Sequence, residues 1–160
     1  MEEILRITGL SIAAYLLGSI PSAVWIGRSL YGIDVREHGS GNAGATNTFR
    51  VLGKKAGSIV LVMDILKGFA AACLIFAVPD ILKDSIKYVN LQLLFGLLAV
   101  LGHLFPLFAQ FRGGKGIATL FGMLIGIHYP SALVCLGIFL IVLLTTKYVS
   151  LSSILTALSF

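Results

Sequence analysis

Residues Ile4–Ile26 read ILRITGLSIAAYLLGSIPSAVWI, an apolar run long enough to decide the class of fold. As an α-helix its 23 residues reach about 34 Å, which is enough to cross a hydrocarbon core of about 30 Å. Pro21 is expected to kink the end of this helix, because proline lacks a backbone N–H and clashes with the preceding turn. The acidic residues Glu2 and Glu3 and the length of the run are unlike a cleavable signal peptide, so we interpret it as a first membrane span.

The composition of the whole chain agrees with a membrane protein. Of its 160 residues, 58% are hydrophobic and only 12% are charged, whereas roughly 25% are charged in a soluble domain. This balance excludes an ordinary soluble globule, a disordered chain and a disulfide-rich scaffold. The two cysteines, Cys73 and Cys135, both lie inside apolar runs, where small core residues are expected rather than a disulfide or a metal site.

Further apolar runs predict four more spans and the beginning of another. The second span is Ser58–Val78, and a polar link that includes Asp80 leads to a third at about Leu91–Phe111. The run Ile117–Thr146 is too long for one crossing and is interrupted by a proline, which predicts two short helices. The last run, Tyr148–Phe160, covers about 20 Å and begins a sixth span. The predicted fold class is therefore an all-α polytopic membrane protein, a helical bundle with five spans and the start of a sixth.

The basic residues are distributed unequally between the two ends of these spans. Eight lie on the side of the polar segment Gly27–Gly57, and three lie on the opposite side. Because positively charged loops stay in the cytoplasm, this asymmetry predicts a cytoplasmic polar segment and an N-terminus outside. The eight are Arg28, Arg36, Arg50, Lys54, Lys55, Arg112, Lys115 and Lys147, and the three are Arg6, Lys83 and Lys87. The net charge of +5 favours anionic ligands at the membrane surface over nucleic acid, for which no binding fold can be recognised outside the spans.

The most unusual part of the polar segment is His38–Arg50, HGSGNAGATNTFR. Its glycines allow backbone N–H groups to converge on an oxyanion, its hydroxyl and amide side chains donate further hydrogen bonds, and Arg50 can hold a phosphate in bidentate fashion. The alternative is a flexible linker. Residues 39–44 also fit the pattern G-x-G-x-x-G, but no strand precedes them and no βαβ unit surrounds them, so a dinucleotide site is not expected. A second glycine turn, Gly113–Gly116, lacks the spacing of a Walker loop but can bind phosphate through its lysine.

Ionisable residues also occur inside the predicted spans. Asp64 and Lys67 share one helical face of the second span, where charge is costly and indicates function. The alternatives are that the two only neutralise each other, that Asp64 anchors a loop arginine, or that Lys67 reaches the cytoplasmic boundary. His103 in the third span is a candidate base, but the acyltransferase pattern of a histidine followed five residues later by an aspartate is broken by Phe108. No carboxylate is then locally available to orient the imidazole, which favours a hydrogen-bonded structural histidine at this position. A structural role is also favoured for His128, because it lies at the break between two predicted helices.

Taken in order, these segments resemble the motifs of the bacterial membrane acyl-phosphate:glycerol-3-phosphate acyltransferases, the PlsY type. The resemblance covers nearly the whole chain and is carried by Gly18–Ser22, Gly39–Asn47, Asp64 with Lys67-Gly68, and Gly102-His103 through Thr119. It implies transfer of a fatty acyl group from acyl phosphate to the 1-hydroxyl of glycerol 3-phosphate, which gives lysophosphatidic acid and phosphate in an early step of bacterial phospholipid synthesis. Because acyl phosphate is already activated, no cofactor is implied, and no cluster of histidine, cysteine and aspartate has the spacing of a metal site.

The resemblance also implies a set of site residues by motif position. The expected catalytic residues are Ser40, Asn42, Arg50, His103 and Lys115, and the expected substrate-binding residues are Gly39, Gly41, Gly44, Thr46, Asn47, Lys67, Gly68, Gly113, Gly114, Gly116 and Thr119. We assign the glycine turns to acyl phosphate, and Arg50 and Lys115 to glycerol 3-phosphate. The acceptor of the hydroxyl proton is left open between a phosphate oxygen of a substrate and His103. The implied partners are the two substrates and the lipid bilayer, and a contact with the enzyme that makes acyl phosphate is a further option.

The family fold implied by the resemblance has seven spans and continues for several tens of residues beyond this chain. Residues 1–160 are thus expected to form a single transmembrane acyltransferase domain that is shortened at its C-terminus. The expected location is the bacterial cytoplasmic (inner) membrane, as a multi-pass protein with its active site facing the cytoplasm. A membrane transporter of a phosphorylated solute is the competing interpretation, although no inverted repeat is evident, and a non-catalytic scaffold would leave the composition of residues 40–50 unexplained.

Overall fold

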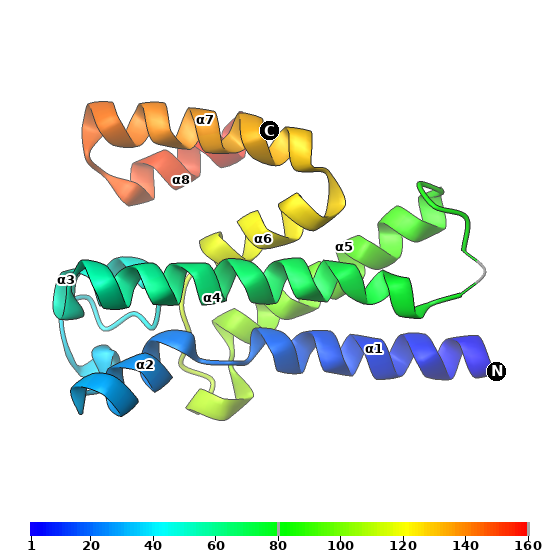
Figure 1. Ribbon diagram of the computed structural model, residues 1–160, viewed down its shortest axis with the longest axis horizontal. Helices are drawn as coiled ribbons and strands as arrows, with labels where there is room; N and C mark the ends of the chain where they lie inside the picture. The colour runs from blue at the N-terminus through cyan, green and yellow to red at the C-terminus, as the bar shows by residue number, and fades with distance from the viewer. Residues whose placement is uncertain (80, 160) are drawn as a thin grey trace. The chain divides into compact units, whose positions relative to one another are not determined.

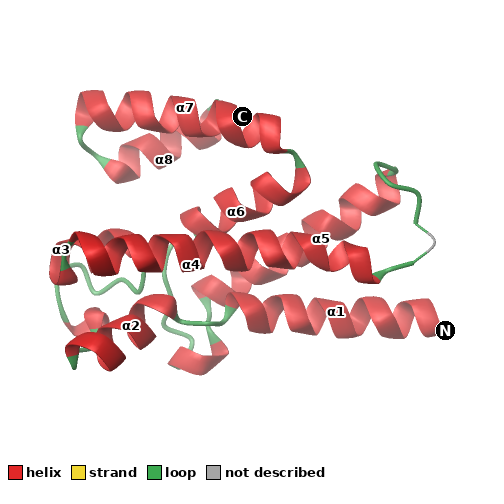
Figure 2. Cartoon of the chain, in the orientation of Figure 1, coloured by secondary structure: helices red, strands yellow, loops and turns green. Residues whose placement is uncertain are grey.

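The computed structural model describes residues 1–79 and 81–159, and every regular element in these ranges is helical (Figures 1 and 2). In chain order the elements are α1 (Glu2–Gly18), α2 (Ser22–Tyr31), the short 3₁₀-helix η1 (Val35–Glu37), α3 (Ala45–Leu52), α4 (Lys54–Cys73), η2 (Leu74–Ala77), α5 (Ile86–Leu104), η3 (Leu107–Ala109), α6 (Ile117–Ile127), α7 (Tyr129–Thr146) and α8 (Val149–Leu158). The predictions that fall on Asp80 and Phe160 lie outside the described residues.

The described ranges contain three helical stretches that are long and apolar enough to cross a membrane. They are Lys54–Ala77, Ile86–Ala109 and Tyr129–Thr146, and the bent pair α1 and α2 adds a fourth if it counts as one span. Helices α6 and α8 are apolar but shorter, at 11 and 10 residues. The predicted class of an all-helical membrane protein is therefore confirmed, with three to four candidate spans.

The chain forms two compact units, Met1–Ile127 and His128–Phe160. In the first unit α4 packs against α6, α1 packs against α5, and the short helix α3 packs against α4 (Figure 1). In the second unit α7 packs against α8. All the polar and glycine-rich motifs identified in the sequence belong to the first unit.

The predicted first span is two helices rather than one. Helix α1 begins at Glu2, the chain breaks after Gly18, and α2 resumes at Ser22 with a bend of 43° between the two. The kink expected at Pro21 is thus confirmed, but it divides two helices instead of ending one. Helix α2 also continues past Ile26 to Tyr31, which corrects the prediction that the polar loop starts at residue 27.

The polar segment that follows is largely helical, which corrects its interpretation as a loop. It contains η1 and α3, and α4 already begins at Lys54 rather than at Ser58. Helix α3 buries the polar residues Asn47 and Thr48 instead of apolar ones. Its apolar residues Ala45 and Leu52 are half-buried and pack against Ala23, Val35 and Val60.

The third span also differs from its predicted limits. Helix α5 starts at Ile86, five residues before Leu91, because the Ser85 hydroxyl accepts a hydrogen bond from the Tyr88 N–H at 3.2 Å and caps the helix. It ends at Leu104 because Pro106 cannot continue it. The residues after α5 up to Phe111 form η3 and a turn instead of a continuing helix.

Glycines next to two candidate site residues allow the surrounding helices to approach closely. A Cβ atom at Gly68 of α4 would overlap the Thr119 carbonyl in α6, and one at Gly102 of α5 would overlap the Tyr15 carbonyl in α1. Small residues at helix crossings let backbones come together in membranes, where apolar side chains gain little by leaving lipid. The two contacts fix the helical positions of the neighbouring residues, Lys67 and His103.

The second unit confirms the predicted break near residue 130. His128 caps α7, because its Nδ1 atom lies 3.4 Å from the Ser131 N–H donor and 2.8 Å from the Ser131 hydroxyl. The structural role expected for this histidine is therefore confirmed. Helix α7 has 18 residues, near the lower limit for a span as expected, and α6 is shorter at 11 residues. Cys135 is buried and Cys73 is half-buried, and neither forms a disulfide.

Candidate active site

Two glycine loops meet at the end of α5. We call residues 38–44 the first glycine loop and residues 112–116 the second. The Ala43 N–H donates to the Gly113 carbonyl at 3.4 Å, and the Gly114 N–H donates to the His103 carbonyl at 3.1 Å. The two segments that the sequence singled out for binding anions are therefore joined to each other and to the last turn of α5.

Asn47 holds the first glycine loop in shape from within α3. Its Oδ1 atom accepts hydrogen bonds from the Ser40 N–H at 2.8 Å and from the Ser40 hydroxyl at 3.1 Å. Its Nδ2 atom donates to the carbonyls of Val35 at 2.8 Å and His38 at 3.1 Å. Because all four hydrogen-bonding positions of this buried amide are used within the protein, its geometry is that of a loop support.

The same loop needs glycine at two of its turns. Gly39 has φ of 61° and Gly41 has φ of 71°, a left-handed conformation that other residues adopt at a cost. A Cβ atom at Gly39 would also overlap the Asn47 amide oxygen. These glycines therefore allow the loop to close over Asn47.

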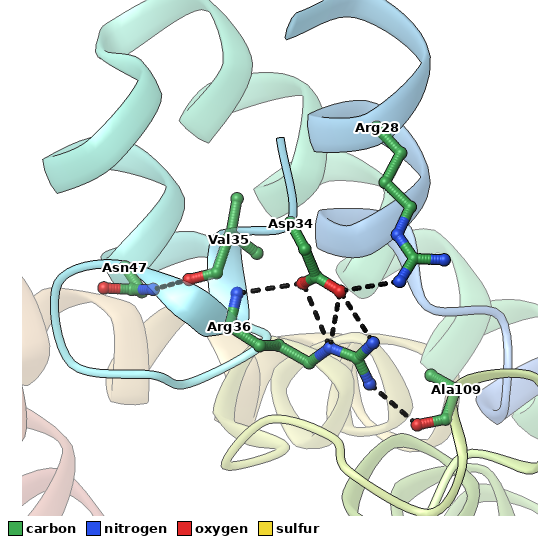
Figure 3. Close-up of polar contacts among 6 residues, drawn as sticks. All are labelled: Arg28, Asp34, Val35, Arg36, Asn47 and Ala109. Atoms are coloured by element: carbon green, nitrogen blue, oxygen red, sulfur yellow. Dashed lines mark hydrogen bonds and ion pairs between the residues drawn. The ribbon is translucent and has the colours of Figure 1, made fainter. Parts of the chain in front are cut away.

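Arg28, Asp34 and Arg36, which precede the first glycine loop in the chain, form an ion-pair network. This network contacts the segment after α5 (Figure 3). The Asp34 carboxylate binds the Arg36 guanidinium at 2.7 Å and the Arg28 guanidinium at 2.9 Å. Arg36 also donates from Nη1 to the Ala109 carbonyl at 2.8 Å. The hydrogen bonds from Arg36, with a smaller contribution from Arg28, hold the pKa of the Asp34 carboxyl well below its usual range, and Asp34 in turn raises the pKa of Arg36.

A buried cluster of charged and polar groups lies beneath the loops. The Oδ1 atom of Asp64 in α4 accepts a hydrogen bond from the Ser22 hydroxyl at 2.9 Å and lies 2.9 Å from the Lys67 ammonium. Lys67 also donates to the Ile20 carbonyl at 3.0 Å, in the break between α1 and α2. The pairing of Asp64 with Lys67 is thus confirmed. Among the described residues no loop arginine pairs with Asp64, so that alternative is wrong.

His103 joins this cluster from α5. Its Nδ1 atom lies 3.6 Å from Asp64 Oδ1, which is longer than a hydrogen bond, and has no hydrogen-bond partner among the described residues. No carboxylate is available locally in the sequence, as expected, but Asp64 faces the imidazole from another helix. The expected hydrogen bond of this histidine is not formed by Nδ1 among the described residues, which corrects that expectation. A small pocket beside it is lined by Ile20, Pro21, Ser22, Ala43, Lys67, His103, Pro106 and Gly113.

The remaining candidate residues differ in their exposure. Ser40, Thr46, Arg50 and Lys115 are exposed, and Asn42 is half-buried. Neither Arg50 nor Lys115 forms an ion pair with any residue in the described ranges. Thr119 is fully buried, and its hydroxyl lacks a partner among residues 1–79 and 81–159.

Three residues that contribute to the site are not among the candidates predicted from the sequence. They are Asp34 and Arg36, which tie the first loop to Ala109, and Ser22, which binds Asp64. The Asp34-x-Arg36 spacing is a local signal for the first two, since a carboxylate two residues before an arginine can accept from its backbone and its side chain. Ser22 belongs to the Gly18–Ser22 motif that carries the resemblance, but no local spacing predicts that it binds Asp64.

The fold and the site define an all-helical integral membrane protein with a buried charged cluster beneath two glycine loops. Among the described residues, no group of three or more histidine, cysteine, aspartate and glutamate side chains could hold a metal ion. The polar groups of the cluster are a hydroxyl, a carboxylate, an ammonium and an imidazole.

Comparison with known proteins assigns the family. The family model for glycerol-3-phosphate acyltransferase matches residues 8–160. The curated glycerol-3-phosphate acyltransferase of Chlorobium phaeobacteroides is 51% identical over 92% of this chain, which spans 64% of that relative's length. The corresponding protein of Bacillus cytotoxicus is 55% identical over 94% of the chain, which spans 72% of its length. The chain belongs to the glycerol-3-phosphate acyltransferase family.

Solved structures give the same assignment. The glycerol 3-phosphate form of PlsY, an integral membrane glycerol 3-phosphate acyltransferase, is 39% identical and superposes with a TM-score of 0.83 over 96% of this chain and 73% of its own. The lysophosphatidic acid form of PlsY is 38% identical, with a TM-score of 0.80 over 96% and 72% of the two chains. The chain is thus a PlsY-type acyltransferase of phospholipid synthesis and a multi-pass integral membrane protein. This assignment confirms the predicted resemblance and activity over a transporter.

Proposed function

We propose that this chain transfers a fatty acyl group from acyl phosphate to the 1-hydroxyl of glycerol 3-phosphate. The hydroxyl oxygen forms a bond to the acyl carbonyl carbon, the bond from that carbon to the phosphate oxygen breaks, and inorganic phosphate leaves with lysophosphatidic acid as the product. Acyl phosphate is a mixed anhydride and is already activated, so the reaction needs no nucleotide or coenzyme A. Its hydrocarbon tail belongs in the bilayer, which agrees with a site built on membrane helices.

One observation carries the proposal: the two glycine loops are joined by the Ala43 to Gly113 hydrogen bond, next to a pocket lined by Lys67 and His103. Two loops rich in backbone N–H donors, held together, suit two anionic headgroups side by side. Orientation of both substrates and stabilisation of developing charge then supply most of the rate. This is the chemistry that an already activated acyl donor requires.

We assign the substrates to the loops by exposure and charge. The glycine turns, with Ser40, Asn42 and Thr46, bind the acyl phosphate, and the exposed cations Arg50 and Lys115 bind glycerol 3-phosphate. Lys67 is held by Asp64 and Ile20, so its charge reaches a substrate only from within the buried cluster. A phosphate oxygen of a substrate or His103 takes the hydroxyl proton.

The membrane arrangement is part of the proposal. Residues 1–160 act as one acyltransferase domain with five spans and the start of a sixth, within a family fold of seven. The N-terminus lies outside the cytoplasmic membrane, and the two glycine loops face the cytoplasm, because eight of the eleven basic residues other than Lys67 lie on their side.

The test is product formation by the purified chain in lipid nanodiscs. Palmitoyl phosphate and radiolabelled glycerol 3-phosphate are expected to give labelled lysophosphatidic acid, whereas palmitoyl-coenzyme A in place of palmitoyl phosphate gives none. Ser40→Ala should lower turnover by roughly tenfold or more through loss of a hydrogen bond to a charged group. Ser29→Ala is the matched control, since Ser29 is exposed and binds only the Trp25 carbonyl among the described residues. Equal rates with the two acyl donors, or absence of product, would refute the proposal.

A further inference from the structure

The chain between α1 and α2 is not helical at residues 19–21, although these residues lie inside the apolar run of the predicted first span (Figure 1). Pro21 has no N–H, and the Ser22 N–H donates back to the Ile20 carbonyl at 3.0 Å instead of continuing the helical pattern. Irregular backbone at membrane depth is tolerated only where protein groups satisfy it. Because Ser22 is buried, this break needs polar partners from a neighbouring helix.

Two side chains of α4 supply these partners. Lys67 donates to the Ile20 carbonyl at 3.0 Å, and the Ser22 hydroxyl donates to Asp64 at 2.9 Å. Asp64 and Lys67 also lie 2.9 Å apart, and they are 1% and 6% exposed, so these contacts are little screened by water. The ion pair therefore holds the chain on both sides of Pro21, one residue before it and one residue after it.

The end of α1 is held independently of the ion pair. A Cβ atom at Gly18 would overlap the Ala99 carbonyl in α5, so the two helices are in close contact directly before the break. Since α1 is fixed up to this point, the conformation of residues 19–21 sets the direction of α2. That direction differs from the direction of α1 by 43°.

The direction of α2 matters for the site in two ways. Pro21 and Ser22 line the small pocket together with Ala43 of the first glycine loop. Arg28 of α2 binds Asp34 at 2.9 Å, in the network that precedes the same loop. A change in the bend would therefore move one wall of the pocket and one member of the network.

We propose that Asp64 and Lys67 are positioning residues for the site: their hydrogen bonds to Ser22 and Ile20 hold the bend between α1 and α2. An ion pair that only neutralises itself would need neither contact, so the hydrogen bonds rather than the charges carry this role. The effect on turnover rests on the proposed acyl transfer, whereas the bend itself does not.

Two double variants of equal charge separate positioning from neutralisation. Asp64→Asn with Lys67→Gln, the polar double variant, removes both charges but keeps an acceptor for Ser22 and a donor for Ile20. Asp64→Leu with Lys67→Met, the apolar double variant, also removes both charges and keeps neither group. Replacing a whole buried ion pair by apolar residues often leaves a protein folded and stable, so both variants are suitable for measurement. If the pair only neutralises itself, the two variants behave alike.

The direct readout is the distance between spin labels on α1 and α2, measured by pulsed electron spin resonance in nanodiscs without substrate. The labels are attached at Arg6→Cys and Leu30→Cys, two exposed positions, after Cys73→Ala and Cys135→Ala. The chain with the intact ion pair and the polar double variant should give the same narrow distribution. The apolar double variant should give a shifted and broader one, because its break adopts other bends. Equal distributions in the two double variants overturn the proposal.

Turnover of palmitoyl phosphate and glycerol 3-phosphate tests the consequence for the reaction. A misplacement of about 1 Å can cost roughly 100-fold in rate, so the apolar double variant should have a kcat roughly 100-fold below that of the polar double variant. Because both variants lack the Lys67 charge, their comparison excludes any direct effect of that charge on a substrate. Equal kcat values overturn the positioning role. If the wild type makes no lysophosphatidic acid, the proposed function fails, whereas the distances still decide whether the pair holds the bend.

Gln92→Met is the matched control for the loss of a buried donor to a backbone carbonyl. Gln92 in α5 is buried and donates to the Gly126 carbonyl at 3.1 Å, as Lys67 does to the break. It lies about 15 Å along α5 from Gly102, which packs beside Ser19. Gln92→Met should lower the melting temperature and leave the label distance unchanged. A change in distance as large as that in the apolar double variant overturns a specific role of Asp64 and Lys67.

Discussion

Arg36 donates a hydrogen bond to the Ala109 carbonyl at 2.8 Å, which links the segment before the first glycine loop to the segment before the second (Figure 3). The same guanidinium binds Asp34, whose side chain is 7% exposed, as is that of Arg36. One side chain therefore sets the separation of two loops that lie far apart in the sequence.

Replacing Arg36 should disturb both loops. Arg36→Lys keeps the charge but loses the planar fork that binds Asp34 and Ala109 together, so we expect a loss of about 1–3 kcal/mol in stability and higher KM values for both substrates. Arg28→Lys is the matched control. Its side chain is 62% exposed and binds Asp34 through one nitrogen, so a loss below about 1 kcal/mol is expected. Thermal unfolding measures the stability of the two variants, and steady-state kinetics measure their KM values. Equal effects of Arg36→Lys and Arg28→Lys would contradict the bridging role of Arg36.

The Asp34 pair also predicts how stability depends on pH. Its carboxyl pKa is lowered in the folded protein, chiefly by Arg36, so its stabilising contribution is complete above the ordinary value of about 3.9. That contribution is lost as the pH falls toward the lowered pKa, because the unfolded state then binds the proton first. The melting temperature of the wild type should therefore fall more steeply below about pH 4 than that of Asp34→Asn. Parallel curves for the two proteins would exclude this origin.

Asn47 and Asn42 should separate loop support from substrate binding. Asn47→Ala leaves four loop groups without their partner and should cost about 2–4 kcal/mol of stability, with activity lost through the collapse of the loop. Asn42→Ala, at a half-buried position, should lower turnover while the melting temperature stays near that of the wild type. Equal melting temperatures for the two variants would show that Asn47 does not support the loop more than Asn42 does.

A contact in the site could be predicted from the sequence only where its two residues lie close together along the chain. Asp64 and Lys67 are three residues apart, so a helix alone brings them together, and the pair was predicted. His103 approaches Asp64 only because α4 and α5 pack together, and no local pattern encodes that contact. The same reason explains Ser22, which binds Asp64 from 42 residues away.

The sequence predicts the end of a helix where a single residue, such as proline, determines it. It does not predict the end of a helix that is determined by packing against other parts of the chain. Pro21 and the proline after Tyr129 mark real breaks. Helix α3 has only eight residues and lies in a polar, glycine-rich segment, so the sequence predicts a loop there. Its inward face combines the loop support Asn47 with Ala45 and Leu52, which pack against a core cluster.

The contact of α4 with α6 should depend on Gly122. A Cβ atom there would overlap the Ile65 carbonyl, so Gly122→Ala should push the helices apart and cost about 1–3 kcal/mol. Gly9→Ala in α1 is the control, because nothing among the described residues lies within 4 Å of its added methyl group, and alanine favours a helix by up to about 1 kcal/mol. Thermal unfolding in nanodiscs distinguishes them, and a neutral Gly122→Ala would show that the helices can separate freely.

The two exposed cations assigned to glycerol 3-phosphate should act on its binding rather than on folding. Neither Arg50 nor Lys115 has an acidic partner among the described residues, so removing either charge leaves no buried group unpaired. A hydrogen bond between charged groups contributes about 1.5–3 kcal/mol, so Arg50→Gln and Lys115→Gln should each raise KM for glycerol 3-phosphate roughly 10- to 100-fold. Added salt should weaken binding in the wild type more than in either variant, because screening acts on the charge that the variants lack.

Lys54 and Lys55 provide the matched comparison for these cations. Both are exposed at the start of α4, close to Arg50 in sequence, and neither is assigned to a substrate. If the charge of this face only attracts anions at long range, Lys54→Gln and Lys55→Gln should raise KM as much as Arg50→Gln does. If Arg50 and Lys115 bind the phosphate directly, the lysine variants should change KM less than about twofold at an ionic strength of about 0.15 M, where the Debye length is about 8 Å. Direct binding predicts the second result, and equal effects in all four variants would refute it.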